Sequence, residues 1–125
     1  MNSEVCGKAA QAFINALICY LQSNAMRTIK IASLTGQDNV RISLRAFMRC
    51  HDPSSGFAKV EEVVNTLTEC SGGSWIEKLG WSLTLEDKEL CFIVPLEDLI
   101  KLVQQAHASE LTGITGILLR RILSA

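Results

Sequence analysis

With 125 residues, the chain has the length of one ordinary domain, and we expect a single domain over residues 1–125. Hydrophobic residues make up 48% of it and charged residues 20%, a balance typical of a globular chain rather than a disordered one. Twelve basic residues against thirteen acidic ones give a net charge of -1. The chain therefore lacks the basic excess with which nucleic-acid-binding proteins neutralise phosphates, and we expect no nucleic acid as partner.

No apolar run reaches the roughly 18 residues that crossing a bilayer requires, and residues 1–8 lack the pattern of a secretory signal. Five cysteines are scattered along the chain without a Cys-x-x-Cys pair, at Cys6, Cys19, Cys50, Cys70 and Cys91. An odd number of cysteines without a leader favours reduced thiols. We therefore expect a soluble protein of the cytoplasm or nucleus that is not secreted and has no membrane span.

The first predicted element is a helix from the N-cap candidate Ser3 to a stop at Ser23 and Asn24. Its apolar residues recur at helical spacing, at Ala10, Phe13, Ile14, Leu17, Ile18 and Leu21. The next apolar segment, residues 28–32, alternates with period two but also fits one helical turn, so strand and helix both stay open. Residues 36–39 predict a turn.

Residues 40–48 start with period two and finish with helical spacing, and we favour a helix there. Residues 51–56 form the strongest break in the chain and predict a loop inside the domain. A second clear helix follows over residues 57–67, with its end near Cys70 and the two following glycines.

Ser74 and Glu77 have the spacing of a capping box and predict a short helix that Gly80 ends. Alternating residues 81–85 and the β-rich run 90–94, joined by a short polar turn, predict a hairpin. Pro95 ends the second strand and opens another helix. We therefore expect a helix-rich α+β fold with a small antiparallel sheet around residues 81–94.

The last stretch, residues 110–124, predicts an extra amphipathic helix that needs a surface to pack on. Its apolar stripe consists of Leu111, Ile114, Leu118 and Ile122. Gly113 and Gly116 would each cost this helix about 1 kcal/mol relative to alanine. The two adjacent cations Arg120 and Arg121 could meet an acidic partner or lipid head groups.

The residues that catalysis would need are sparse. His51 and His107 could act as bases near neutral pH, but Cys50 beside His51 is not a nucleophile–base pair, because adjacent side chains point apart. Cysteine and histidine ligands at metal-binding spacing are missing, and so is a phosphate-binding glycine motif. We therefore expect neither an enzyme nor a cofactor, and a protein that works by binding another protein.

Two tryptophans are the aromatic candidates for recognition. Trp75 and Trp81 flank Gly80, and tryptophan is enriched both at binding hot spots and in cores. We favour the core for Trp75 and leave core and interface open for Trp81.

A leucine-rich helix is followed by the basic-apolar segment 26–31, and later by Leu79-Gly80-Trp81, the run 90–95 and the helix that opens at Leu96. This order of parts resembles the PUB (or PUG) domain of peptide N-glycanase and of ubiquitin-pathway adaptor proteins. The family has a lysine-tyrosine-arginine-x-isoleucine-arginine stretch after its first helix and a glycine-aromatic pair farther on. The resemblance covers about residues 10–108, outside the final helix, and implies a helical bundle with a small antiparallel sheet.

The resemblance implies docking of the C-terminal tail of the AAA ATPase valosin-containing protein, through its terminal aromatic and acidic residues. By position, Lys30 stands where the family has its tail-binding arginine, and Gly80 and Trp81 stand at its glycine and phenylalanine. The family's tyrosine falls on Met26 and its groove asparagine falls near Cys19. Lysine in place of arginine loses bidentate recognition of a carboxylate. We thus expect a peptide-binding groove between residues 26–31 and Gly80–Trp81.

Two other functions stay open. The chain could be a structural subunit that forms a homodimer through its C-terminal amphipathic helix. Alternatively, it could be a small enzyme that uses Cys50 or Cys91 together with a histidine supplied by the fold.

Overall fold

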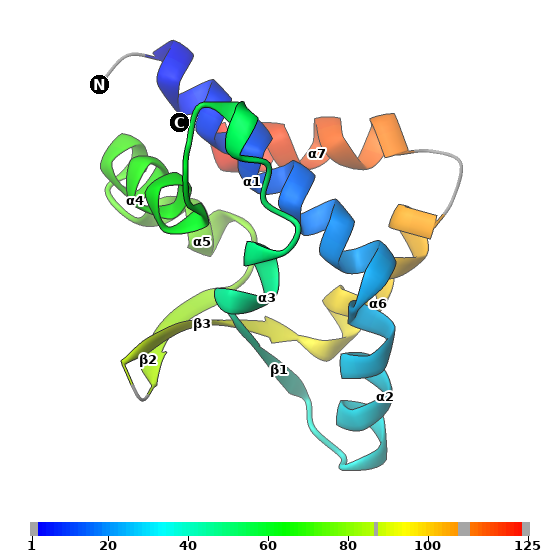
Figure 1. The fold of residues 1–125 in the computed structure, drawn as a ribbon. Coiled ribbons are helices and arrows are strands. Elements are labelled where there is room, and N and C mark those ends of the chain that lie inside the picture. The colour runs from blue at the N-terminus through cyan, green and yellow to red at the C-terminus, as the bar shows by residue number, and fades with distance from the viewer. Residues whose placement is uncertain (1–2, 87, 108–110, 124–125) are drawn as a thin grey trace.

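The computed structural model describes residues 3–86, 88–107 and 111–123, and it confirms a helix-rich α+β fold with a small antiparallel sheet (Figure 1). In chain order the elements are α1 (Ser3–Ser23), α2 (Ala25–Leu34), β1 (Asn39–Ser43), α3 (Arg45–Met48), a 3-10 turn (Pro53–Ser55), α4 (Val60–Ser71), α5 (Ser74–Lys78), β2 (Ser82–Glu86), β3 (Glu89–Pro95), α6 (Leu96–His107) and α7 (Leu111–Leu123). Of the described helices, none is both long and apolar enough for a bilayer span.

Helix α1 is the centre of the fold and begins and ends where the sequence predicts. It contacts α2, α3, α4, α6 and α7, and Figure 1 shows it running through the helical layer. Four of its alanines are buried, Ala9, Ala10, Ala12 and Ala16. Small side chains let neighbouring helices approach the α1 backbone on several sides, so one helix can serve as the core of the whole layer. The side chain of the N-cap candidate Ser3 lies outside the described part of the structure.

The sheet has the order β1-β3-β2, and both pairs are antiparallel. Val40 pairs with Val94 and Ile42 with Phe92, and all four side chains are buried against the helices. Arg41, between the two β1 residues, is exposed on the other face. The predicted hairpin is confirmed as β2 and β3, while Asp87 in its turn lies outside the described residues.

Two segments with ambiguous patterns take different structures. Residues 28–32 belong to helix α2. The helix favoured for residues 40–48 is wrong over its first half, which forms strand β1, and right only for Arg45–Met48. Strand wins at Val40 and Ile42 because β3 offers a partner whose register buries both β-branched side chains.

The short helix α5 forms as predicted, but its capping box does not. Gly73, not Ser74, is the N-cap residue, and the Ser74 hydroxyl donates to the Ser71 carbonyl at 3.0 Å. The predicted stop is confirmed, since Gly80 has a φ of 81° and its N–H donates to Glu77 O at 2.9 Å. The left-handed conformation suits glycine because it has no Cβ.

The core is aromatic at its centre. Phe13 of α1 contacts four rings, those of Phe47, Trp75, Trp81 and Phe92, at centroid distances of 5.0 to 6.3 Å. Trp75 is completely buried, as favoured, and Trp81 is 5% exposed. Each edge-to-face pair adds about 0.5–1.5 kcal/mol beyond burial. These contacts join α1 to the sheet and to the turn at Gly80.

Helix α7 finds its packing surface within the same chain. Leu118 and Ile122 of the predicted stripe are buried, and the helix contacts α1, α5 and α6. The side chains of Leu111 and Ile114 lie outside the described part of the structure. Dimerisation through α7 would therefore use other apolar side chains, such as Ile117 and Leu123, which are 43% and 47% exposed.

The expectation of reduced thiols is wrong for four of the five cysteines. Cys6 of α1 is bonded to Cys70 of α4, and Cys19 of α1 is bonded to Cys50, two residues after α3. Cys91 forms neither of these two bonds, and it is buried. The bonded pairs are 64 and 31 residues apart in sequence, so loop-closure entropy assigns each bond about 4 kcal/mol of stabilisation. The expected cytoplasmic location thereby loses its support from cysteine usage.

Alkylation and peptide mapping of the native protein test these bonds. We expect the peptides containing Cys6 and Cys70 to remain linked without reductant, and likewise those containing Cys19 and Cys50. Cys91 should react only after unfolding, because its thiol is shielded from solvent. Rapid alkylation of four or five thiols in the native, freshly purified chain would contradict the assignment.

Candidate functional site

The structure distributes the five predicted peptide-binding residues over three places. Gly80 and Trp81 stand together in the turn between α5 and β2. Met26 and Lys30 are exposed on α2. Cys19 lies in α1, half-buried and bonded to Cys50, so its sulfur is not available as a thiol.

The two halves of the predicted groove line separate hollows. Gly80 and Trp81 line a hollow with residues of α6 and α7. Thr28 and Ile31 line another hollow with residues of β1. Lys30 and Met26 line neither of the two. The fold therefore keeps Gly80 and Trp81 together but does not bring Lys30 into their hollow.

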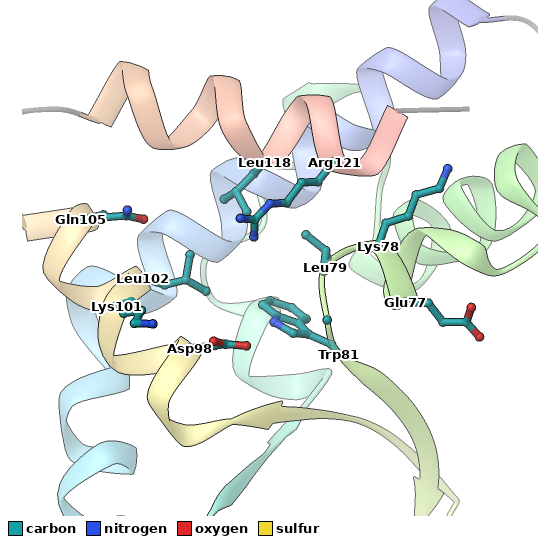
Figure 2. Close-up of a pocket in the computed structure, with 11 residues that line it drawn as sticks. Glu77, Lys78, Leu79, Trp81, Asp98, Lys101, Leu102, Gln105, Leu118 and Arg121 are labelled. Atoms are coloured by element: carbon teal, nitrogen blue, oxygen red, sulfur yellow. The ribbon is translucent and has the colours of Figure 1, made fainter.

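We call the first of these spaces the tryptophan hollow; it has a volume of about 440 Å³. It is lined by Glu77, Lys78, Leu79, Gly80, Trp81, Asp98, Lys101, Leu102, Gln105, Leu118 and Arg121 (Figure 2). Trp81, Leu79 and Leu118 are each at most 5% exposed and form its apolar floor. Arg121 extends from α7 toward the same space, whereas Lys78 and Glu77 point away from it (Figure 2). The hollow thus combines an apolar floor with a polar rim.

Local sequence places these side chains. The left-handed turn at Gly80 reverses the chain after α5, and Trp81 N–H then donates to Ile76 O at 3.2 Å. On α6, Asp98, Lys101, Leu102 and Gln105 recur at spacings of three and four, which puts them on one helix face. Leu118 and Arg121 share a face of α7 for the same reason.

The two tryptophans differ in the state of their indole N–H groups. Trp75 Nε1 donates to Thr68 Oγ1 at 3.2 Å, so its polar atom is satisfied inside the core. Trp81 Nε1 has no hydrogen-bond partner among the described residues. It is not fully buried, unlike His51 Nδ1 and Ser55 Oγ, which are buried and also have no partner. Because a largely buried tryptophan normally pairs its N–H, this open donor at the hollow is chemically significant.

The rim of the hollow is of mixed charge with a small basic excess. Without Lys78 and Glu77, which point away, the lining has two cations, Lys101 and Arg121, against one carboxylate, Asp98, so 2 − 1 leaves +1. Lys101 also forms an exposed ion pair with Glu97 at 3.6 Å. An exposed pair of this kind is worth little, so it does not prevent Lys101 from meeting a ligand.

The residues considered for catalysis lie outside this hollow. Cys50 is bonded to Cys19, and His51 Nε2 is 2.6 Å from the carbonyl oxygen of Phe57. The hydroxyl of Ser54 donates to Asp52 and lowers the pKa of that carboxyl group. Burial raises the pKa of Tyr20. Among the described residues there is no cluster of three or more His, Cys, Asp or Glu that could hold a metal ion.

Comparisons with protein-family models, with curated proteins and with solved structures find no match for this chain. The resemblance to the PUB domain therefore stays a prediction.

The sequence pattern does not single out most of the polar residues that line the hollow. Asp98 and Lys101 lie on the polar side of an amphipathic helix, a pattern that any solvated helix shows. The sequence offers Arg121 as a contact for an acidic partner, but spacing does not reveal that α7 folds back over Gly80 and Trp81. Only the glycine-tryptophan pair itself pointed to this place.

Two glycine substitutions test the turn that shapes the hollow. We expect Gly80→Ala to lower the free energy of unfolding by about 1 kcal/mol, because alanine disfavours a φ of 81°. A Cβ there would lie 3.8 Å from Asp98 Oδ2, an ordinary contact, so the backbone is the source of the cost. Gly116→Ala in α7 is the matched control and should raise stability by up to about 1 kcal/mol. Denaturant unfolding measures both; equal effects of the same sign would contradict this account.

Proposed function

We propose that this chain is a non-catalytic, PUB-like interaction module that binds an acidic or aromatic C-terminal peptide in the tryptophan hollow. The observation that carries the proposal is the indole N–H of Trp81, which has no partner among the described residues and belongs to the apolar floor that Trp81 forms with Leu79 and Leu118. A ligand that covers this floor and supplies a hydrogen-bond acceptor satisfies both features at once.

The size of the hollow fits part of a peptide. Its volume of about 440 Å³ falls within the roughly 300–1,000 Å³ of ordinary ligand sites. One aromatic or large aliphatic side chain can rest on Leu79, Trp81 and Leu118. Interfaces often bind in this way, with one apolar anchor surrounded by polar contacts.

The rim supplies the matching polar contacts. Arg121 and Trp81 Nε1 are donors suited to a carboxylate, and arginine can hold a carboxylate through two parallel hydrogen bonds. Asp98, which lies across the hollow from Arg121 and on the side of the Trp81 indole nitrogen, can accept a peptide N–H (Figure 2). This combination favours a terminal residue that has both a carboxylate and backbone donors.

The partner remains the one that the family resemblance implies, the C-terminal tail of an AAA ATPase. In our proposal the cation that meets this tail is Arg121 of α7, not Lys30 of α2. Arg121 lies beyond the residues that the resemblance covers, so the recognition would be PUB-like in ligand but different in its basic residue. A helix-rich fold with a small antiparallel sheet is also the architecture that the resemblance implies.

Calorimetric titration with the tail peptide of the ATPase tests the proposal. We expect micromolar binding that Arg121→Glu weakens at least tenfold, because the substitution replaces an attractive charge with a repulsive one. Arg120→Glu is the matched control: the neighbouring residue has the same charge and does not line the hollow. Trp81→Phe keeps an aromatic ring but removes the N–H and should weaken binding severalfold.

Lys30→Glu separates the two candidate cations. Loss of binding in Lys30→Glu with none in Arg121→Glu would move the site to α2 and overturn our assignment of the hollow. If the unmodified chain does not bind the tail peptide at millimolar concentration, the peptide is not its ligand and the proposed function is wrong.

A further inference from the structure

The outer edge of β1 has backbone groups that no described residue pairs. Leu44 N–H donates to Leu90 O at 2.9 Å and Leu96 N–H to Asp38 O at 2.8 Å, at the two ends of the β1–β3 ladder. In an antiparallel ladder, residue pairs that exchange backbone hydrogen bonds alternate with pairs that do not. Because residues 38 and 44 bond to β3, the even-numbered residues of β1 between them also bond to β3. Asn39, Arg41 and Ser43 therefore direct their N–H and C=O groups away from the sheet.

A second hollow lies beside this edge; we call it the edge hollow. Its volume is about 810 Å³, and its walls include Thr28, Ile31 and Ala32 of α2 and Asn39, Val40 and Arg41 of β1. Figure 1 shows α2 and β1 separating after the turn that joins them. Ile31 is 56% exposed, so an apolar side chain stands open next to the free edge. The edge hollow shares no lining residue with the tryptophan hollow.

We propose that β1 accepts an extended segment of a partner protein as a fourth, edge-paired strand. The unpaired groups of Asn39, Arg41 and Ser43 supply the main-chain hydrogen bonds of such strand addition. Side chains of an added strand alternate between the two faces of the sheet. Those on the helical face meet Ile31, and those on the other face meet Arg41. The partner strand therefore alternates apolar and acidic residues.

Charge argues against a second copy of the chain as the occupant. If two β1 strands paired antiparallel about their centre, Arg41 would stand opposite its own counterpart, and like charges directly opposite destabilise a sheet. A charged residue on an edge strand commonly protects it from self-association. Arg41 keeps one ion pair, with Glu86 at 3.0 Å, yet its side chain is 66% exposed and has donors left for an acidic partner. The same arginine that prevents self-pairing thus selects the sign of the partner.

Amide hydrogen exchange with a synthetic probe tests this proposal. The probe is a capped peptide of roughly eight alternating valine and glutamate residues, a usual strand length. Without it, the amides of Asn39, Arg41 and Ser43 should exchange fast while those of Val40 and Ile42 are protected. Saturating probe should slow the first three amides at least tenfold and leave the other two unchanged. Protection at Gly80 and Trp81 instead, or none at millimolar probe, would overturn the proposal.

Charge reversal supplies the controls. The Arg41→Glu variant should no longer bind the valine–glutamate probe and should bind a valine–lysine probe instead. Arg45→Glu, at an exposed residue just after the strand, should still prefer the valine–glutamate probe. A probe methylated on every backbone nitrogen cannot donate to the edge and should not bind. If the unmodified chain dimerises and the same three amides become protected, the edge binds a second copy of the chain. This result would overturn the proposal of an acidic partner strand.

Discussion

Everything in this fold depends on burying α1 on several sides at once. The contacts of Phe13 with Phe47, Trp75, Trp81 and Phe92 tie that helix to α3, α5 and the sheet. Two disulfide bonds fasten its two ends, one to α4 and one to the segment after α3. A chain of this size has one core, so loosening α1 would release the helices and the sheet together.

The candidate peptide site is an extension of that core. Trp81 contacts Phe13 and Phe92 with its ring, and no described residue pairs its N–H at the hollow. A recognition group held by core packing is rigid before the ligand arrives, which reduces the entropy lost on binding. Helix α7 completes the arrangement, because Leu118 joins the core while Arg121, one turn later, reaches the rim. The edge of β1 offers a different kind of recognition, through the backbone rather than through side chains.

Amphipathic elements were predictable from sequence, and elements defined by distant partners were not. The helices at residues 3–23 and 60–71 and the hairpin are visible because one period dominates each segment, although the second helix begins at Val60 and not at Phe57 as predicted. The prediction for β1 is wrong because its five residues, beside a helical turn, fit both the helical and the strand period. Only pairing with β3, some 50 residues later, decides between helix and strand. The disulfide pairing could not be predicted, because cysteine spacing does not show that α1 lies beside α4 and the loop at Cys50. Gly80 and Trp81 were found as a candidate site, but Arg121 needed the fold.

The most direct test of the central claim uses the two indole N–H signals that the two tryptophans give in a nitrogen-15 correlation spectrum. On titration with the acidic, aromatic tail peptide, our account predicts that the Trp81 indole signal shifts progressively and saturates. The Trp75 signal, whose N–H is bonded to Thr68 within the core, should stay in place. A bound peptide that leaves the Trp81 signal unmoved would contradict the tryptophan hollow as the recognition site.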